Sequence, residues 1–282
     1  MNTLPWYKGI ILGLIQGATE FFPVSSSAHL VIAQNYLGVR EPARTLAAFD
    51  IFLHFGTLMA AIYYFRWDLA WLFGIWIKPL REKLRAKNPP SFFEEKTAKK
   101  VGPLIILGIL PAAFVGAMFH QFFEDLFSDT MMVSLLLMVT GMVIYTTKKI
   151  QGNTLGFAQM NAKQALLIGL AQIFSILPGI SRSGTTIACG LFVKLKPEVA
   201  FRFSFLMIIL LVASAFCLEL SDLQYLEWDL LMSAICGTVT AAVAGYVCVG
   251  IMFKLMVQNK FPYFAYYCWI VGSLVLFKEM FF

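Results

Sequence analysis

Hydrophobic residues along the chain gather into long, nearly uninterrupted runs that are separated by short polar connections. A helix needs about 17–25 mostly apolar residues to cross a bilayer. Six runs meet that requirement, and the pattern therefore predicts six membrane-spanning helices, over residues 46–66, 101–119, 131–147, 199–217, 229–252 and 263–281.

Two further apolar segments, residues 6–37 and 163–195, are interrupted in the middle by Pro, Gly and Ser. Each remaining piece is too short to cross a bilayer. We therefore expect two re-entrant helical hairpins. Irregular backbone is not tolerated against lipid, so both turns must be shielded by the bundle or line a wet cavity.

Composition supports an all-α integral membrane protein with one membrane domain over residues 1–282. Hydrophobic residues make up 59% of the chain and charged residues 13%, against about a quarter charged in soluble proteins. Mean hydropathy is +0.75. The net charge of +6 comes mainly from short loops, which excludes a nucleic-acid partner. The five cysteines lie in or beside apolar runs and form neither a metal-ligand spacing nor a disulfide framework.

Basic residues predict the orientation, because cytoplasmic loops are enriched in Lys and Arg. Residues 78–100 hold eight of them, whereas 120–130 and 218–228 hold none. With six crossings, both termini lie outside. The first hairpin then enters from the outer side and the second from the cytoplasm.

The chain also repeats itself. GLIQ at 13–16 matches GLAQ at 169–172, and the serines at 25 and 27 match those at 181 and 183 at the same offset of 156. Each half, approximately 1–150 and 160–282, holds one hairpin and three spans. An odd number of spans inverts the second half, which predicts an inverted-topology repeat of the kind found in transporters.

The first hairpin carries a polar cluster between its two helical pieces. Gln16 and Glu20 are four residues apart and share one helix face. Pro23 should end that helix. Three serines follow, Ser25, Ser26 and Ser27, and they can cap the returning helix. His29 lies about one turn into that helix.

In the second hairpin, Pro178 and Gly179 should form the turn, and polar residues should open the next helix: Ser181, Arg182, Ser183, Thr185 and Thr186. A helix N-terminus with small residues is an anion site suited to phosphate, and Arg182 adds a bidentate donor. Purely structural roles are the alternative: caps for the serines, a satisfied histidine, a packing amide at Gln16 and an interfacial anchor at Arg182. Asp50 and His54, four residues apart, are candidates for the cavity mouth.

At these residues the sequence resembles the undecaprenyl-diphosphatase, or bacitracin-resistance, family. The family runs appear here as Q-G-A-T-E-F-F-P-V-S-S-S-A-H (16–29) and P-G-I-S-R-S-G-T-T (178–186). The resemblance implies an interlocked inverted-repeat fold in the bacterial plasma membrane. It also implies hydrolysis of a C55 polyprenyl diphosphate to its monophosphate, which recycles the carrier for cell-wall synthesis and is associated with bacitracin tolerance.

The same resemblance implies roles for the matching residues. Glu20, Ser26, His29 and Arg182 would be catalytic, with Ser26 or water as the nucleophile and with Glu20 or His29 accepting its proton. Phosphate binding would fall to Gln16, Ser25, Ser27, Gly179, Ser181, Ser183, Thr185 and Thr186. A divalent cation, Mg²⁺ or Ca²⁺, would be held by Glu20. Gln16 departs from the family's first Glu and cannot be a base or an anionic ligand.

A lipid-phosphate transporter or flippase is the competing hypothesis, since inverted repeats reached from both faces also fit alternating access. The polyprenyl diphosphate lipid is the expected partner. The sequence leaves the oligomeric state open, with a homodimer as one candidate.

Overall fold

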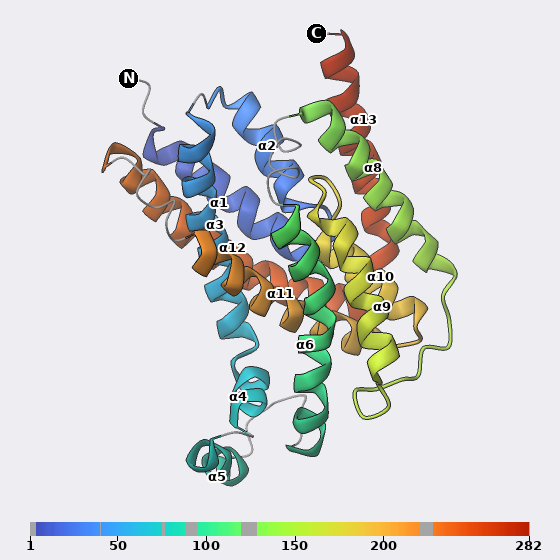
Figure 1. The fold of residues 1–282 in the computed structure, drawn as a ribbon. Coiled ribbons are helices and arrows are strands. Elements are labelled where there is room, and N and C mark those ends of the chain that lie inside the picture. The colour runs from blue at the N-terminus through green and yellow to red at the C-terminus, as the bar shows by residue number, and fades with distance from the viewer. Residues whose placement is uncertain are drawn as a thin grey trace.

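The computed structural model of the chain describes residues 4–39, 41–74, 77–87, 95–119, 129–219 and 228–281. Throughout these residues the fold is helical, and no β-strand occurs in them (Figure 1). The expectation of an all-α membrane protein is therefore confirmed. The predicted outer loops, 120–130 and 218–228, lie largely outside the described residues.

Six helices are long and apolar enough to cross a membrane, as the hydrophobic runs predicted. They are α3 (Ala43–Tyr64), α6 (Glu95–Met118), α8 (Thr130–Thr146), α11 (Pro197–Glu219), α12 (Trp228–Val257) and α13 (Phe264–Phe281). More than half of the apolar stretch of α3 and of α11 is buried, whereas less than a third of that of α6, α12 and α13 is buried. The exposed faces carry large apolar side chains such as Phe114, Val243 and Leu274, which suits contact with lipid.

The two interrupted segments form pairs of short helices. The first pair is α1 (Trp6–Phe21) and α2 (Ser26–Tyr36), and the second is α9 (Ala162–Ile173), continued by η3 (Phe174–Ile176), and α10 (Arg182–Phe192). A helix rises about 1.5 Å per residue, so none of the four spans a bilayer. The helix ends fall where the sequence predicted, because Pro23 stops α1 while Ser25 and Ser181 cap α2 and α10.

A short helix that the hydrophobic pattern did not predict follows α3. This helix, α4 (Arg66–Gly74), carries the buried Asp68, and α5 (Lys78–Lys87) follows it. Asp68 pairs with Arg202 at the start of α11. This largely buried ion pair ties α4 to α11.

The two halves of the chain interlock through the short helices. The first hairpin packs on the second half, through α1 on α12, and the second hairpin packs on the first half, through α9 on α6. Glycines set both contacts: a Cβ on Gly13 would lie 2.3 Å from the carbonyl oxygen of Gly237, and a Cβ on Gly169 would lie 2.3 Å from that of Gly108. Backbones this close leave no room for any side chain.

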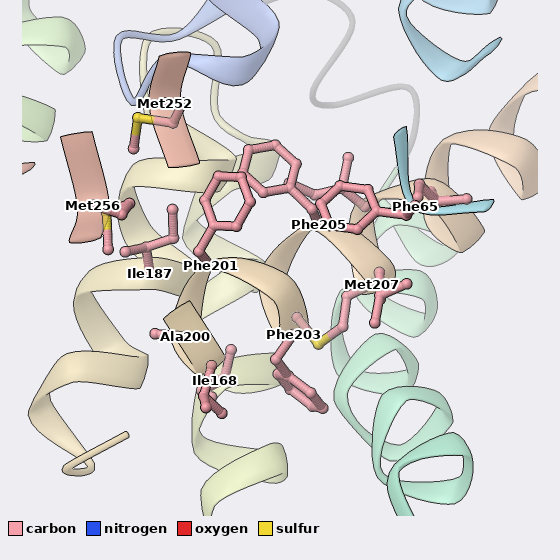
Figure 2. Close-up of a cluster of buried hydrophobic side chains, with 14 of the residues drawn as sticks. Phe65, Ile168, Ile187, Ala200, Phe201, Phe203, Phe205, Met207, Met252 and Met256 are labelled. Atoms are coloured by element: carbon pink, nitrogen blue, oxygen red, sulfur yellow. The ribbon is translucent and has the colours of Figure 1, made fainter. Parts of the chain in front are cut away.

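The hydrophobic core gathers around α11. Phe201 and Phe205 lie with ring centroids 4.6 Å apart, and Phe205 stacks on Phe21 of α1 at 5.7 Å. Figure 2 shows Phe201 and Phe205 in one apolar cluster with Met252 and Met256 of α12 and Ile187 of α10. The core therefore joins both hairpins to the spans and fixes their position.

The chain ends lie at one end of the molecule, and α4 and α5 lie at the other (Figure 1). This arrangement agrees with six crossings that return the C-terminus to the side of the N-terminus. The side of the membrane on which each end lies stays a prediction from the basic loops.

The glycine contacts generate a stability prediction. Gly13→Ala should lower the melting temperature in detergent micelles, followed by circular dichroism, because overpacking of a tight contact costs about 1–3 kcal/mol. Gly116→Ala in α6 is the matched control, since its Cβ would meet nothing nearer than 3.9 Å. Equal melting temperatures for the two variants would contradict the role of the close backbone contact.

Candidate active site

A short hydrogen-bond chain joins the end of α1 to the start of α2. The Ser26 hydroxyl donates to Glu20 Oε2 at 2.6 Å, and Gln16 Nε2 donates to the same oxygen at 2.9 Å. Gln16 is fully buried, and the Glu20 side chain is 11% exposed. A carboxylate that accepts the proton of a hydroxyl group is the arrangement that activates a nucleophile.

The turn between these residues has a conformation that presents hydroxyl groups. Ser25 has a φ of +64° and caps α2, and its Oγ accepts from the amide of Ala28 at 3.4 Å. Ser25 and Ser27 hydroxyls lie 3.2 Å apart. A left-handed backbone at a residue other than glycine costs energy and is typical of functional sites.

His29 lies on the same helix, but both of its ring nitrogens are engaged elsewhere. Nδ1 lies 2.8 Å from the Ser25 carbonyl oxygen, and Nε2 lies 2.9 Å from the Tyr267 hydroxyl of α13. A carbonyl oxygen can only accept, so Nδ1 carries a hydrogen and, in the neutral ring, Tyr267 donates to Nε2. The Tyr267 ring also lies nearly parallel to the imidazole, with centroids 5.6 Å apart. This geometry orients His29 and does not direct it at Ser26.

His54 of α3 completes the surroundings of the carboxylate. Its Nε2 lies 3.9 Å from Glu20 Oε2, while its Nδ1 lies 2.9 Å from the Asp50 carbonyl oxygen. The Asp50 carboxylate accepts from Gln34 of α2 at 2.8 Å. The two residues that the sequence suggested for the cavity mouth therefore contact the hairpin, with His54 beside the reactive group.

The second turn is held by one threonine of α8. Gly179 has a φ of +103°, and a Cβ there would lie 2.5 Å from the Val133 carbonyl oxygen. Thr140 donates to the Gly179 carbonyl oxygen at 2.9 Å and accepts from the Ser181 amide at 3.0 Å. The turn is therefore rigid and can take only glycine at this position.

The hydroxyl groups of the second motif serve mainly its own helix. Ser181 caps α10 by accepting from the Gly184 amide at 3.1 Å. Thr185 donates to the Ser181 carbonyl oxygen and Thr186 to the Arg182 carbonyl oxygen, each at 2.8 Å. Ser183 is buried, and its hydroxyl lies 3.3 Å from that of Ser181. These residues shape the helix N-terminus.

The two hairpins meet at this point. Ser183 donates to the Phe22 carbonyl oxygen of the first turn at 3.4 Å. The positive charge of Arg182 acts on the Glu20 carboxylate. Among the described residues, the Arg182 guanidinium has no hydrogen-bond or ion-pair partner. A guanidinium at the N-terminus of α10 that acts electrostatically on the carboxylate holding Ser26 is suited to receive a phosphate group.

The site also offers oxygen atoms that suit a hard divalent cation. Gln16 Oε1 is buried and has no hydrogen-bond partner among the described residues, and it lies on the same side chain that donates to Glu20. The described residues contain no cluster of three or more His, Cys, Asp or Glu side chains that would form a complete metal site. Magnesium commonly binds through one or two carboxylates together with substrate phosphates, so Glu20 and Gln16 fit a cation that substrate helps to hold.

Two residues of this region, Tyr267 and Thr140, were not assigned to it from the sequence. His54 was suggested for the cavity mouth from its spacing to Asp50. Tyr267 and Thr140 lie inside apolar spans and carry no local pattern that distinguishes them from packing residues.

Comparison with known proteins gives consistent matches over nearly the whole chain. The family model described as "Bacitracin resistance protein BacA" matches residues 9–274. A protein of Halothermothrix orenii named undecaprenyl-diphosphatase is 37% identical over 96% of each chain. A protein of the same name from Methanobrevibacter smithii is 35% identical over 95% of each chain. Another, from Desulfosudis oleivorans, is 36% identical over 97% of this chain and 98% of the relative. The chain therefore belongs to the bacitracin-resistance, or undecaprenyl-diphosphatase, family.

Proposed function

We propose that this protein hydrolyses undecaprenyl diphosphate to undecaprenyl phosphate and inorganic phosphate at the site between the two hairpins. The observation that carries the proposal is the Ser26 hydroxyl bonded at 2.6 Å to Glu20, whose carboxylate is also under the positive charge of Arg182, a guanidinium without a partner among the described residues. A transporter of the lipid would need only groups that bind its phosphate. A hydroxyl group that is hydrogen-bonded to a carboxylate can in addition act as a nucleophile. The names of the relatives agree with hydrolysis and not with transport alone.

The proposed arrangement places the site within a multi-pass protein of the plasma membrane. The two halves form an inverted repeat, and the hairpins enter from opposite faces with the first one on the outer side. The reciprocal contacts of α1 on α12 and of α9 on α6 support this arrangement. The polyprenyl tail stays in the bilayer while the diphosphate enters the cavity.

In the first chemical step, Ser26 Oγ attacks the terminal phosphorus. The bond from that phosphorus to the bridging oxygen breaks, and its electron pair stays on undecaprenyl phosphate. Glu20 takes the Ser26 proton, since it already accepts that hydrogen bond. His29 has both nitrogens engaged with Ser25 and Tyr267, so its role is to hold the first turn. In the second step, water attacks the phosphoserine and releases phosphate.

Phosphoryl transfer depends mostly on positioning and on neutralising the charge of the oxygens. Arg182 and the N-termini of α2 and α10 supply positive charge and donors for the terminal phosphate. Ser25, Ser27, Ser181 and Ser183 shape the two turns that present these amides. A Mg²⁺ or Ca²⁺ ion held by Glu20 and Gln16 would neutralise phosphate charge when bound.

The role of Arg182 can be tested with purified protein in detergent. Arg182→Ala should lower kcat by about 10²–10³-fold, by analogy with the loss of one electrostatic stabiliser of a transition state. The measurement is phosphate release from undecaprenyl diphosphate. Arg66→Ala is the matched control, because Arg66 lies on α4 with its guanidinium over the Tyr63 ring. Turnover of Arg182→Ala at the parent rate would remove this residue from the site.

The identity of the nucleophile can be tested separately. Ser26→Ala should abolish formation of a phosphoenzyme, detected by mass spectrometry of acid-quenched protein, and should stop steady-state turnover. Glu20→Gln should reduce turnover as well, because an amide cannot accept the proton. If Ser26→Ala kept its turnover, water would be the nucleophile, with Glu20 as its base.

A further inference from the structure

The second hairpin contains a buried amide that the reaction above does not use. Gln172 on α9 is fully buried, and neither its amide nitrogen nor its amide oxygen has a hydrogen-bond partner among the described residues. Its backbone carbonyl oxygen, in contrast, accepts from the Ser175 hydroxyl at 2.6 Å. In a native protein, a buried polar side chain without a protein partner commonly indicates a functional role or a bound water or ion.

The internal repeat shows where this amide lies. The buried positions of α9 are 165, 168, 169 and 172, and α1 is buried at 9, 12, 13 and 16, which is the same set at the offset of 156. The helix caps correspond as well. Ser25 accepts from the amide three residues later at 3.4 Å, and Ser181 does so at 3.1 Å. Gln172 therefore lies on the same face of its hairpin as Gln16 does in the first.

The two hairpins differ in the group that this amide meets. In the first, Gln16 Nε2 and the Ser26 hydroxyl both donate to Glu20 Oε2, at 2.9 and 2.6 Å. In the second, the offset puts Ile176 at the position of Glu20 and Arg182 at the position of Ser26. Isoleucine cannot accept a hydrogen bond. The second hairpin thus keeps two donors and has no carboxylate at the equivalent position.

The charge of the second hairpin suits an anionic ligand for these donors. Residues 162–196 contain no Asp or Glu, and Arg182 is the basic residue at the turn. Its positive charge acts on the Glu20 carboxylate. Ser183 of the same turn donates to the Phe22 carbonyl oxygen of the first turn. An anion bound at the second turn therefore lies next to the turn that carries Ser26.

We propose that Gln172 is a phosphate-binding residue, whose amide nitrogen donates to an oxygen of the terminal phosphoryl group that Arg182 also binds. The inference rests on the proposed function. The phosphate oxygen takes the position that the Glu20 carboxylate oxygen has in the first hairpin. The two glutamines of the repeat thus serve different partners: Gln16 holds the group that activates Ser26, and Gln172 holds the group that Ser26 attacks.

Gln172→Leu tests this role with little change in the shape of the side chain. Loss of a hydrogen bond to a charged group should lower kcat/KM for phosphate release from undecaprenyl diphosphate by about 10- to 100-fold. The inhibition constant of the product, inorganic phosphate, should rise by a similar factor. The melting temperature should equal or exceed that of the parent, because the variant removes a buried amide that has no partner within the described part of the chain.

Ser204→Ala is the matched control. Ser204 on α11 is also fully buried, and its hydroxyl oxygen likewise has no partner among the residues that the structure describes. It lies outside both hairpins, so Ser204→Ala should keep the parent kcat/KM and the parent inhibition by phosphate. An equal loss in Ser204→Ala and Gln172→Leu would contradict a specific role for Gln172.

A second pair of variants gives the second hairpin the carboxylate of the first. In Ile176→Glu, the new carboxylate can accept from Gln172 and Arg182 and should compete with phosphate for both donors. Ile176→Gln has the same shape without the charge. We expect kcat/KM of Ile176→Glu to lie at least about tenfold below that of Ile176→Gln, with inhibition by phosphate lost in Ile176→Glu alone. Equal kinetics in the two variants would overturn the proposal.

Binding can also be measured without turnover. Farnesyl diphosphate, a short polyprenyl diphosphate, would be titrated by calorimetry into Ser26→Ala protein with and without Gln172→Leu. The double variant should bind about 10- to 100-fold more weakly. Equal binding, parent-like kcat/KM in Gln172→Leu, or a lower melting temperature that accompanies the loss would each overturn the inference. A parent protein that binds the diphosphate but releases no phosphate would overturn the proposed function, and the binding comparison would still decide the role of Gln172.

Discussion

The structure depends on the enclosure of two helix turns inside an apolar bundle. Backbone amides and carbonyls that no helix satisfies are costly in lipid, so the turns after α1 and after α9 need protein around them. Each half of the chain provides this enclosure for the hairpin of the other half, through α12 against α1 and α6 against α9. Glycines at the crossing points allow the backbones to approach closely.

The backbone groups at these two turns, which would be costly to expose to lipid, also form part of the candidate site. The N-termini of α2 and α10 have amides that point away from their helices, and such amides bind phosphate well. The first turn adds a carboxylate that is acceptable in a buried place because Gln16 and Ser26 donate to it. The second turn adds a guanidinium, so the halves have the same backbone plan but different chemistry. Gln16 donates to Glu20 through its amide nitrogen, and its amide oxygen has no partner within the described part of the chain.

Much of the fold was predictable because its signals are local. The lengths of the apolar runs predicted the six spans, Pro23 predicted the end of α1, and Ser25 and Ser181 predicted the caps. The contacts that lock the structure were not predictable in the same way. The Asp68–Arg202 pair joins residues 134 apart in the sequence, and the His29–Tyr267 contact joins residues 238 apart. In both pairs, the sequence around one residue gives no sign of which residue it will contact.

The sequence by itself determined the spans, the two broken segments and the residue types at each turn, because these follow from hydrophobicity, backbone restriction and capping over a few residues. Only the tertiary structure decided which side chains meet. It turned His29 toward Tyr267, placed the Ser26 hydroxyl on Glu20 and brought His54 to the same carboxylate. The physical reason is that hydrogen-bond direction depends on how separate helices cross, and the crossing of α1, α3 and α13 is set by packing far along the chain.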